Sequence, residues 1–110
     1  MGDGITVYSI GKNQEMESDV YRKADKFVVD SWLHCKNKSD LQRMLKENYL
    51  SKKDLYAELP ELLSGKKPAR ESDRERIFTR AIGLVNQDIA LAHAIYRSAL
   101  EQGIGTRLPY

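Results

Sequence analysis

The sequence predicts an α/β fold with about three mostly parallel strands, flanking helices and a long C-terminal helix. Strand-like and helix-like segments alternate along the chain, as they do where helices connect parallel strands. The strand-like segments are short apolar runs, which suits strands buried on both faces of a sheet. The last long segment carries apolar residues at helical spacing.

Three segments have the length and composition of buried strands. The first, ITVYSI, covers residues 5–10 and stops at Gly11. The second, KFVVDS, covers residues 26–31, and the third, RIFTRAIG, covers residues 76–83. They are rich in the β-branched and aromatic residues that strands favour. Helical connections between them would be right-handed crossovers, which produce a parallel sheet.

Short helices are predicted between these strands. Ser18 can cap a helix that follows the first strand. Ser39 and Gln42 have the spacing of a capping box before a second helix. Residues 55–63 hold a further short helical pattern around a proline, and residues 64–76 are typical of a charged loop.

The segment GLVNQDIALAHAIYRSALEQGIG, residues 83–105, is apolar on nearly every side of the predicted helix. One face carries Val85, Ile89, Ala92, Tyr96 and Ala99, and the others carry Leu84, Leu91, Ala94, Ile95 and Leu100. A sheet covers only a stripe of roughly 100° on such a helix. We therefore expect a neighbour to cover the rest, either another part of a longer chain or a second copy of this one.

The composition excludes several classes of protein. The 110 residues suffice for one folding unit, residues 1–110, with a single core. The net charge is only +2, so no nucleic-acid partner is expected. No apolar run reaches the roughly 20 residues of a membrane span, so no membrane partner is expected either. One cysteine allows no internal disulfide and fits a cytoplasmic location.

Four segments carry a resemblance that covers essentially the whole chain. They are GITVYSIGK, KADKFVVDSWLHCKNKSDL, DLYAELPELLSGKKPARESDRERI and FTRAIGLVNQDIALAHAIYRSALEQGIGTRL. In this order they resemble the last part of the ornithine cyclodeaminase/mu-crystallin family. The most specific match is the turn from Gly83 to Asp88 with the alanine-rich helix that follows it.

The resemblance implies a partial Rossmann-like, three-layer unit from an NAD(P)-dependent enzyme. Family members are deaminases, dehydrogenases and ketimine or pyrroline-carboxylate reductases, which transfer a hydride at the α-carbon of an amino or imino acid. They are several times longer than this chain. The chain would then be a C-terminal fragment whose partner is the missing N-terminal half, and it would be inactive alone.

By the same resemblance, two strand ends would touch the nicotinamide of NAD or NADP. Ser9, Ile10 and Gly11 finish one strand, and Ala81 and Gly83 finish the other. Ligands of parallel α/β sheets bind outside the carboxyl ends of the strands, and small residues there let a flat ring approach. The sequence has no glycine-rich pyrophosphate loop, because residues 2–4 precede a strand and residues 103–105 follow a helix. We expect no tight cofactor binding by this chain alone.

The family's cyclodeaminases carry an aspartate just after the first of these strands, in a Gly-x-Asp context. Here Lys-Asn-Gln-Glu follows Gly11, so no aspartate takes that place. This difference favours a dehydrogenase or reductase over ornithine deamination. We assign no catalytic residue and no metal ligand, since the adjacent His34 and Cys35 would point to different faces of a helix.

A second hypothesis is an interaction module without enzymatic activity. Such a module would keep the half-fold and use its apolar C-terminal helix to bind a partner or to self-associate. Asp88, near the start of that helix, complements the helix dipole, and by the resemblance it would also lie near the cofactor side of the domain.

Overall fold

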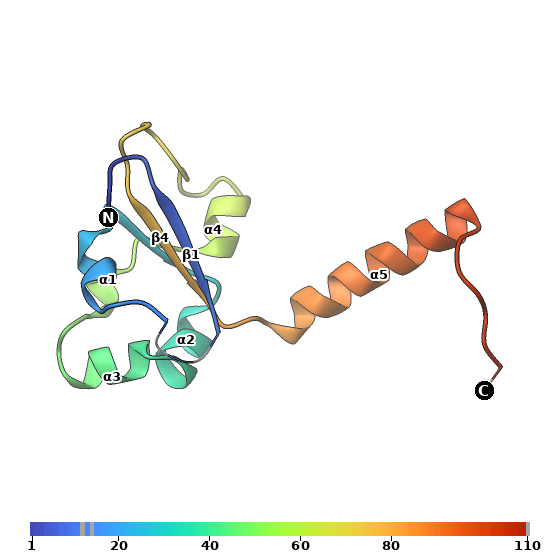
Figure 1. Cartoon of the computed structure of the whole chain (residues 1–110), viewed down its shortest axis with the longest axis horizontal. Helices are drawn as coiled ribbons and strands as arrows, with labels where there is room; N and C mark the ends of the chain where they lie inside the picture. The colour runs from blue at the N-terminus through green and yellow to red at the C-terminus, as the bar shows by residue number, and fades with distance from the viewer. Residues whose placement is uncertain (12, 14, 110) are drawn as a thin grey trace.

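The computed structural model describes residues 1–11, 13 and 15–109. Its elements are β1 (Thr6–Ile10), α1 (Asp19–Lys23), β2 (Lys26–Val29), α2 (Trp32–Lys38), α3 (Leu41–Lys46), the 3-10 turn η1 (Lys52–Asp54), β3 (Ala57–Glu58), α4 (Leu59–Leu63), β4 (Ile77–Ala81) and α5 (Val85–Gln102). The alternation of strands and helices confirms the predicted α/β class (Figure 1).

The strands form one parallel sheet in the order β1-β4-β2-β3. Phe78 of the inner strand β4 is level with Val7 of β1 and with Phe27 of β2. The strand β3 adds a fourth member to the expected three, because Ala57 pairs with Val28 before α4 begins. Pairing and complete burial of Ala57 override the local helical pattern at this position.

Three helices, α1, α2 and α3, cover one face of the sheet (Figure 1). Tyr21 of α1 packs edge-on against Phe27 and Phe78, with ring centroids 5.0 and 4.7 Å apart. The core also contains Val29, Trp32, Cys35, Leu41, Met44 and Leu50. This face holds the apolar cluster that stabilises the sheet.

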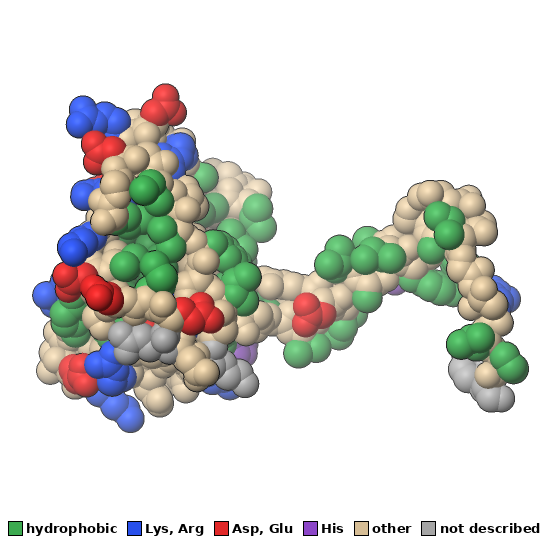
Figure 2. All heavy atoms as spheres, viewed as in Figure 1, with side chains coloured by type: hydrophobic (Ala, Val, Ile, Leu, Met, Phe, Trp, Pro, Cys, Tyr) green, Lys and Arg blue, Asp and Glu red, His purple; other side chains and the backbone are tan. Residues whose placement is uncertain are grey.

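On the opposite face, β2 and β4 are covered and the edge strand β1 is open. Lys26 of β2 points to this face, and its Nζ donates to Glu71 and to the Ala69 carbonyl, both at 2.7 Å, so the loop after α4 lies over it. On β1, by contrast, the side chains of Tyr8 and Ile10 remain 52% and 62% exposed. Figure 2 shows hydrophobic side chains over the part of the body where Figure 1 draws β1.

Helix α5 projects away from the sheet and packs against none of it (Figure 1). None of its 18 residues is buried, although its sequence is largely apolar. We expected one side of this helix to face the sheet, and that expectation was wrong. Only three residues join β4 to α5, and Gly83 among them has a φ of 79°, so the chain continues outward. Among the described residues, no helix has the length and apolar character needed to cross a bilayer.

The local signals at the helix ends were partly confirmed. Gly103 ends α5 in the left-handed conformation, with a φ of 66°, as the glycine-rich tail predicts. The capping box of Ser39 and Gln42 was wrong, because α3 begins with Asp40 as its N-cap residue. The hydroxyl of Ser39 instead accepts the Leu41 amide and donates to the Cys35 carbonyl, which joins α2 to α3.

Charging the exposed helix is expected to leave the fold intact. Leu91 and Ile95 are 62% and 60% exposed, so Leu91→Lys and Ile95→Lys remove no core contact. We expect both variants to keep the melting temperature of the parent chain and to lower its self-association, because they break up an apolar patch. Sedimentation velocity and a thermal melt measure the two effects.

Leu41→Ala is the matched control, since Leu41 is completely buried. It should lower the free energy of unfolding by about 2–5 kcal/mol. Unfolding of both lysine variants would instead mean that α5 packs on the sheet in solution, contrary to its position here.

Candidate functional site

The carboxyl ends of β1 and β4 lie side by side. Ile10 pairs with Ala81 in the parallel register, and the Gly11 amide donates to the Ala81 carbonyl at 3.0 Å. Three of the residues expected near a nicotinamide are therefore neighbours at one edge of the sheet. Ile10 is 62% exposed and can be reached from outside, whereas the side chain of Ala81 is buried.

Gly83 is held on the other side of β4 by a buried carboxylate. Asp30, which follows β2, is only 2% exposed. Its Oδ2 accepts the amides of Ile82 and Gly83, both at 3.0 Å. Its Oδ1 accepts the Ser31 amide at 2.7 Å and the Cys35 thiol at 3.1 Å. Asp30 therefore fixes the turn from β4 into α5.

Ser9 does not present its hydroxyl to the open edge. The hydroxyl donates to Oε2 of Glu15 at 2.6 Å and accepts a hydrogen bond from Nη1 of Arg80. Arg80 lies on β4 and is 1% exposed. A contact between Ser9 and a nicotinamide would therefore use its backbone, since its side chain is bonded on the helix-covered face.

Asp30 and Arg80 are structural determinants of this edge that the sequence analysis missed. Each is a charged residue inside or directly after an apolar strand, in KFVVDS and in IFTRA. Charged side chains are rarely fully buried unless they are paired. That rule would have marked both positions as sites of specific hydrogen bonds.

The backbone conformation explains why positions 11 and 83, at the carboxyl ends of β1 and β4, are glycines. Gly11 has a φ of 124°, and a Cβ there would lie 2.9 Å from Oε1 of Glu15. Gly83 has a φ of 79°, and a Cβ there would meet nothing within 4 Å. The space in front of Gly83 is therefore open, which fits the approach of a flat ring. Lys12 and Gln14 lie outside the described residues.

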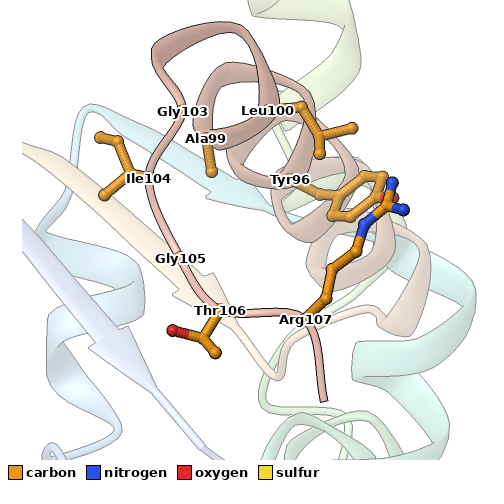
Figure 3. Close-up of a pocket in the computed structure, with 8 residues that line it drawn as sticks. All are labelled: Tyr96, Ala99, Leu100, Gly103, Ile104, Gly105, Thr106 and Arg107. Atoms are coloured by element: carbon orange, nitrogen blue, oxygen red, sulfur yellow. The ribbon is translucent and has the colours of Figure 1, made fainter. Parts of the chain in front are cut away.

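Two surface hollows adjoin α5. One of about 530 Å³ lies at its start, where Gly83 and Asp88 face His34 and Lys38 of α2. The other, of about 420 Å³, lies between the last turns of the helix and the tail after Gly103, beside Tyr96, Leu100 and Arg107 (Figure 3). Both are open to solvent and have mixed polar and apolar walls.

The remaining candidates, Cys35 and His34, contact residues directly before α2 in the chain. Burial, with a smaller contribution from the hydrogen bond to Asp30, raises the pKa of the Cys35 thiol to about 12. His34 faces Ser31 through Nδ1, with the two atoms 3.0 Å apart. Within residues 1–11, 13 and 15–109, no group of three or more His, Cys, Asp or Glu side chains could hold a metal ion.

Removing the Asp30 carboxylate is expected to destabilise the chain. Asp30→Ala would leave four donors without their acceptor, so we expect a loss of about 2 kcal/mol or more of unfolding free energy. Urea titration measures it. Asp25→Ala is the control, because Asp25 pairs with Arg76 at the exposed amino end of the sheet, where its loss should destabilise the chain less. Equal losses for the two variants would contradict the role given to Asp30.

The native thiol is expected to be unreactive at pH 8. With a pKa of about 12, roughly 1 in 10,000 Cys35 side chains would be a thiolate, and the sulfur is completely buried. A disulfide reagent such as DTNB should label Cys35 in urea and not in buffer. Fast stoichiometric labelling of the folded chain would show that α2 opens readily.

Comparison with known proteins supports the resemblance in the sequence. The family model described as "Ornithine cyclodeaminase/mu-crystallin family" matches residues 4–103. The chain is 40% identical over 95 residues to N-((2S)-2-amino-2-carboxyethyl)-L-glutamate dehydrogenase of Staphylococcus aureus. That match covers 86% of this chain and 28% of the relative.

Solved structures share the fold. The Delta(1)-pyrroline-2-carboxylate reductase of Thermococcus litoralis, in complex with NADH and L-proline, superposes with a TM-score of 0.83 at 33% identity. The match covers 98% of this chain and 35% of the reductase. An archaeal alanine dehydrogenase dimer with bound NAD gives a TM-score of 0.80 at 28% identity, over 99% of this chain and 35% of that one.

The matched proteins agree in how much of their length this chain covers. The chain spans about a third of the length of the relatives that it matches. The similar solved structures are longer proteins whose matched part includes nearly all of this chain, α5 among it. The parallel sheet, the turn at Gly83 and the family match together show that the chain belongs to the ornithine cyclodeaminase/mu-crystallin family.

Proposed function

We propose that this chain forms the C-terminal part of an NAD(P)-dependent enzyme that reduces imino acids or oxidises amino acids at the α-carbon. The proposal rests on one combination of features. The carboxyl ends of β1 and β4 lie side by side, and the chain leaves apolar side chains of β1 and α5 uncovered. The rest of the enzyme would lie on the same polypeptide or on another.

The relatives named above and the sequence after Gly11 favour a dehydrogenase or reductase over a deaminase. The matched proteins named above are dehydrogenases and a reductase that act on amino or imino acids. No aspartate follows Gly11 in the sequence, where the family's cyclodeaminases carry one. We therefore propose a small amino or imino acid as substrate. A cytoplasmic location fits the single, unpaired cysteine.

The chain's role in the reaction would be to shape one wall of the cofactor site. The cofactor, when bound, supplies or accepts the hydride. Ile10 and Gly11 would line the place of the nicotinamide, because they end an edge strand beside Ala81. Gly83 would border the same place from the other side of β4, where the space in front of it is open. Residues outside this chain would hold the pyrophosphate, since its sequence has no glycine-rich loop between a strand and a helix.

The missing partner would cover two surfaces. One is the free edge and open face of β1, where Tyr8 and Ile10 are exposed. In parallel sheets, a strand at the edge is normally covered by other parts of the protein or paired with a further strand. The other is α5, where Val85, Ile89, Leu91, Ile95, Tyr96 and Leu100 are each at least 49% exposed. The N-terminal part of an enzyme of this family is the partner that we propose for both.

The chain alone is expected to bind neither NADH nor NADPH tightly. Without a glycine-rich loop at a helix N-terminus, the pyrophosphate loses its main anchor. Isothermal titration calorimetry should therefore give no dissociation constant in the micromolar range. Micromolar binding of either nucleotide by the purified chain would contradict the proposal that the site is shared with another part.

A chimera tests the function itself. Residues 1–110 would replace the third of the Thermococcus litoralis reductase that they match. That match covers 98% of this chain. We expect the chimera to bind NADH and to oxidise it with Delta(1)-pyrroline-2-carboxylate or another cyclic or open imino acid.

The control chimera carries Leu91→Lys and Ile95→Lys, which should prevent docking of the two parts and abolish turnover. A folded chimera that does not bind NADH would refute the proposed enzyme role. Self-association of the unmodified chain through α5 into a well-defined oligomer, combined with that failure, would favour the interaction module.

A further inference from the structure

A buried ionic cluster lies under the carboxyl edge of the sheet. Phe78 and Arg80 are two residues apart along β4, so their side chains point to the same face of the sheet. The Arg80 side chain therefore lies under the helices. Its Nη2 lies 3.1 Å from Oδ1 of Asp40 in an ion pair, and this carboxylate also accepts the Tyr21 hydroxyl at 3.0 Å. Only 1% of the Arg80 side chain and 4% of the Asp40 side chain are exposed.

Three further contacts of Arg80 go to the end of β1 and to the segment that follows it. Nη1 donates to the hydroxyl of Ser9 and lies 3.5 Å from Oε2 of Glu15. Nη2 donates to the carbonyl of Asn13 at 2.6 Å. One side chain thus holds three positions across the turn after β1.

Ser9 and Glu15, which flank Gly11, are bonded to each other. Oε2 of Glu15 accepts the Ser9 hydroxyl, and a side chain at position 11 would collide with Oε1, because a Cβ there would lie 2.9 Å from it. The Gly11 amide is bonded to Ala81 on the neighbouring strand. Gly11, with its φ of 124°, is therefore bonded to β4 through its amide and lies between two residues, Ser9 and Glu15, that contact Arg80.

Stability alone does not explain a buried arginine at this position. A buried ion pair often stabilises no better than apolar residues of similar size, because both charges lose their hydration. Nε of Arg80 has no hydrogen-bond partner among the described residues, which adds to that cost. What the guanidinium provides in return is a rigid, planar set of donors that reaches several acceptors at once.

We propose that Arg80 is a positioning residue, which holds Ser9, Asn13 and Glu15 so that Ile10 and Gly11 form the wall of the nicotinamide site. This inference rests on the proposed function for the identity of the ligand. The hold of Arg80 on the segment can be tested on the chain alone, without any cofactor. Failure of that test would leave the family assignment and the chimera experiment unaffected.

Hydrogen exchange followed by NMR tests the proposal on three variants. Arg80→Met removes the charge and keeps the length, and Arg80→Lys keeps the charge and loses the planar fork. Arg76→Met is the matched control, because Arg76 forms an ion pair with Asp25 at the amino edge of the same strand. The readouts are the exchange rates of the Gly11 amide and of the amides of Val28 and Phe78 in the sheet.

We expect both Arg80 variants to exchange the Gly11 amide about tenfold faster or more, with sheet amides within about twofold of the parent chain. Arg76→Met should leave the Gly11 amide unchanged. An equal acceleration of all amides in the Arg80 variants would show a general loss of stability and overturn the proposal. Unfolding of both Arg80 variants, or unchanged exchange at Gly11, would overturn it as well.

Discussion

The Asp30 carboxylate fixes the start of the connection between the sheet and α5. It is buried, and it accepts the amides of Ile82 and Gly83 in the three-residue connection between β4 and α5. With both amides held and Gly83 in a left-handed conformation, the path of the chain is set where it leaves β4. The exposed helix α5 begins directly after this connection.

This arrangement accounts for the uneven distribution of apolar surface. The face under α1, α2 and α3 has a complete core, whereas β1 on the other face and α5 expose large apolar side chains. At about 25 cal/mol per Å², covering such surfaces would contribute several kcal/mol to an association. The relatives, about three times as long, have additional chain that could supply the cover. Arg80 and Asp30 would then hold opposite sides of β4 in the shape that the assembled site requires.

The sequence predicted the general fold well, because short apolar runs and alternating elements are strong local signals. It located the three longer strands, the left-handed end of α5 at Gly103 and the neighbouring ends of β1 and β4. It could not predict β3, whose two residues become a strand only through pairing with β2. It also missed Arg80 and Asp30, since their partners lie up to 71 residues away in the chain and only the tertiary fold brings them together.

The most direct test of the shared interface is a hydrogen-exchange footprint of this chain with the N-terminal two thirds of the Thermococcus litoralis reductase added as a separate polypeptide. If the free edge of β1 and helix α5 are the surfaces that the rest of the enzyme covers, their amides should become protected together, and the amides of α1 and α3 should not change. Protection of α1 and α3 without α5, or a stable complex that protects neither β1 nor α5, would contradict the account.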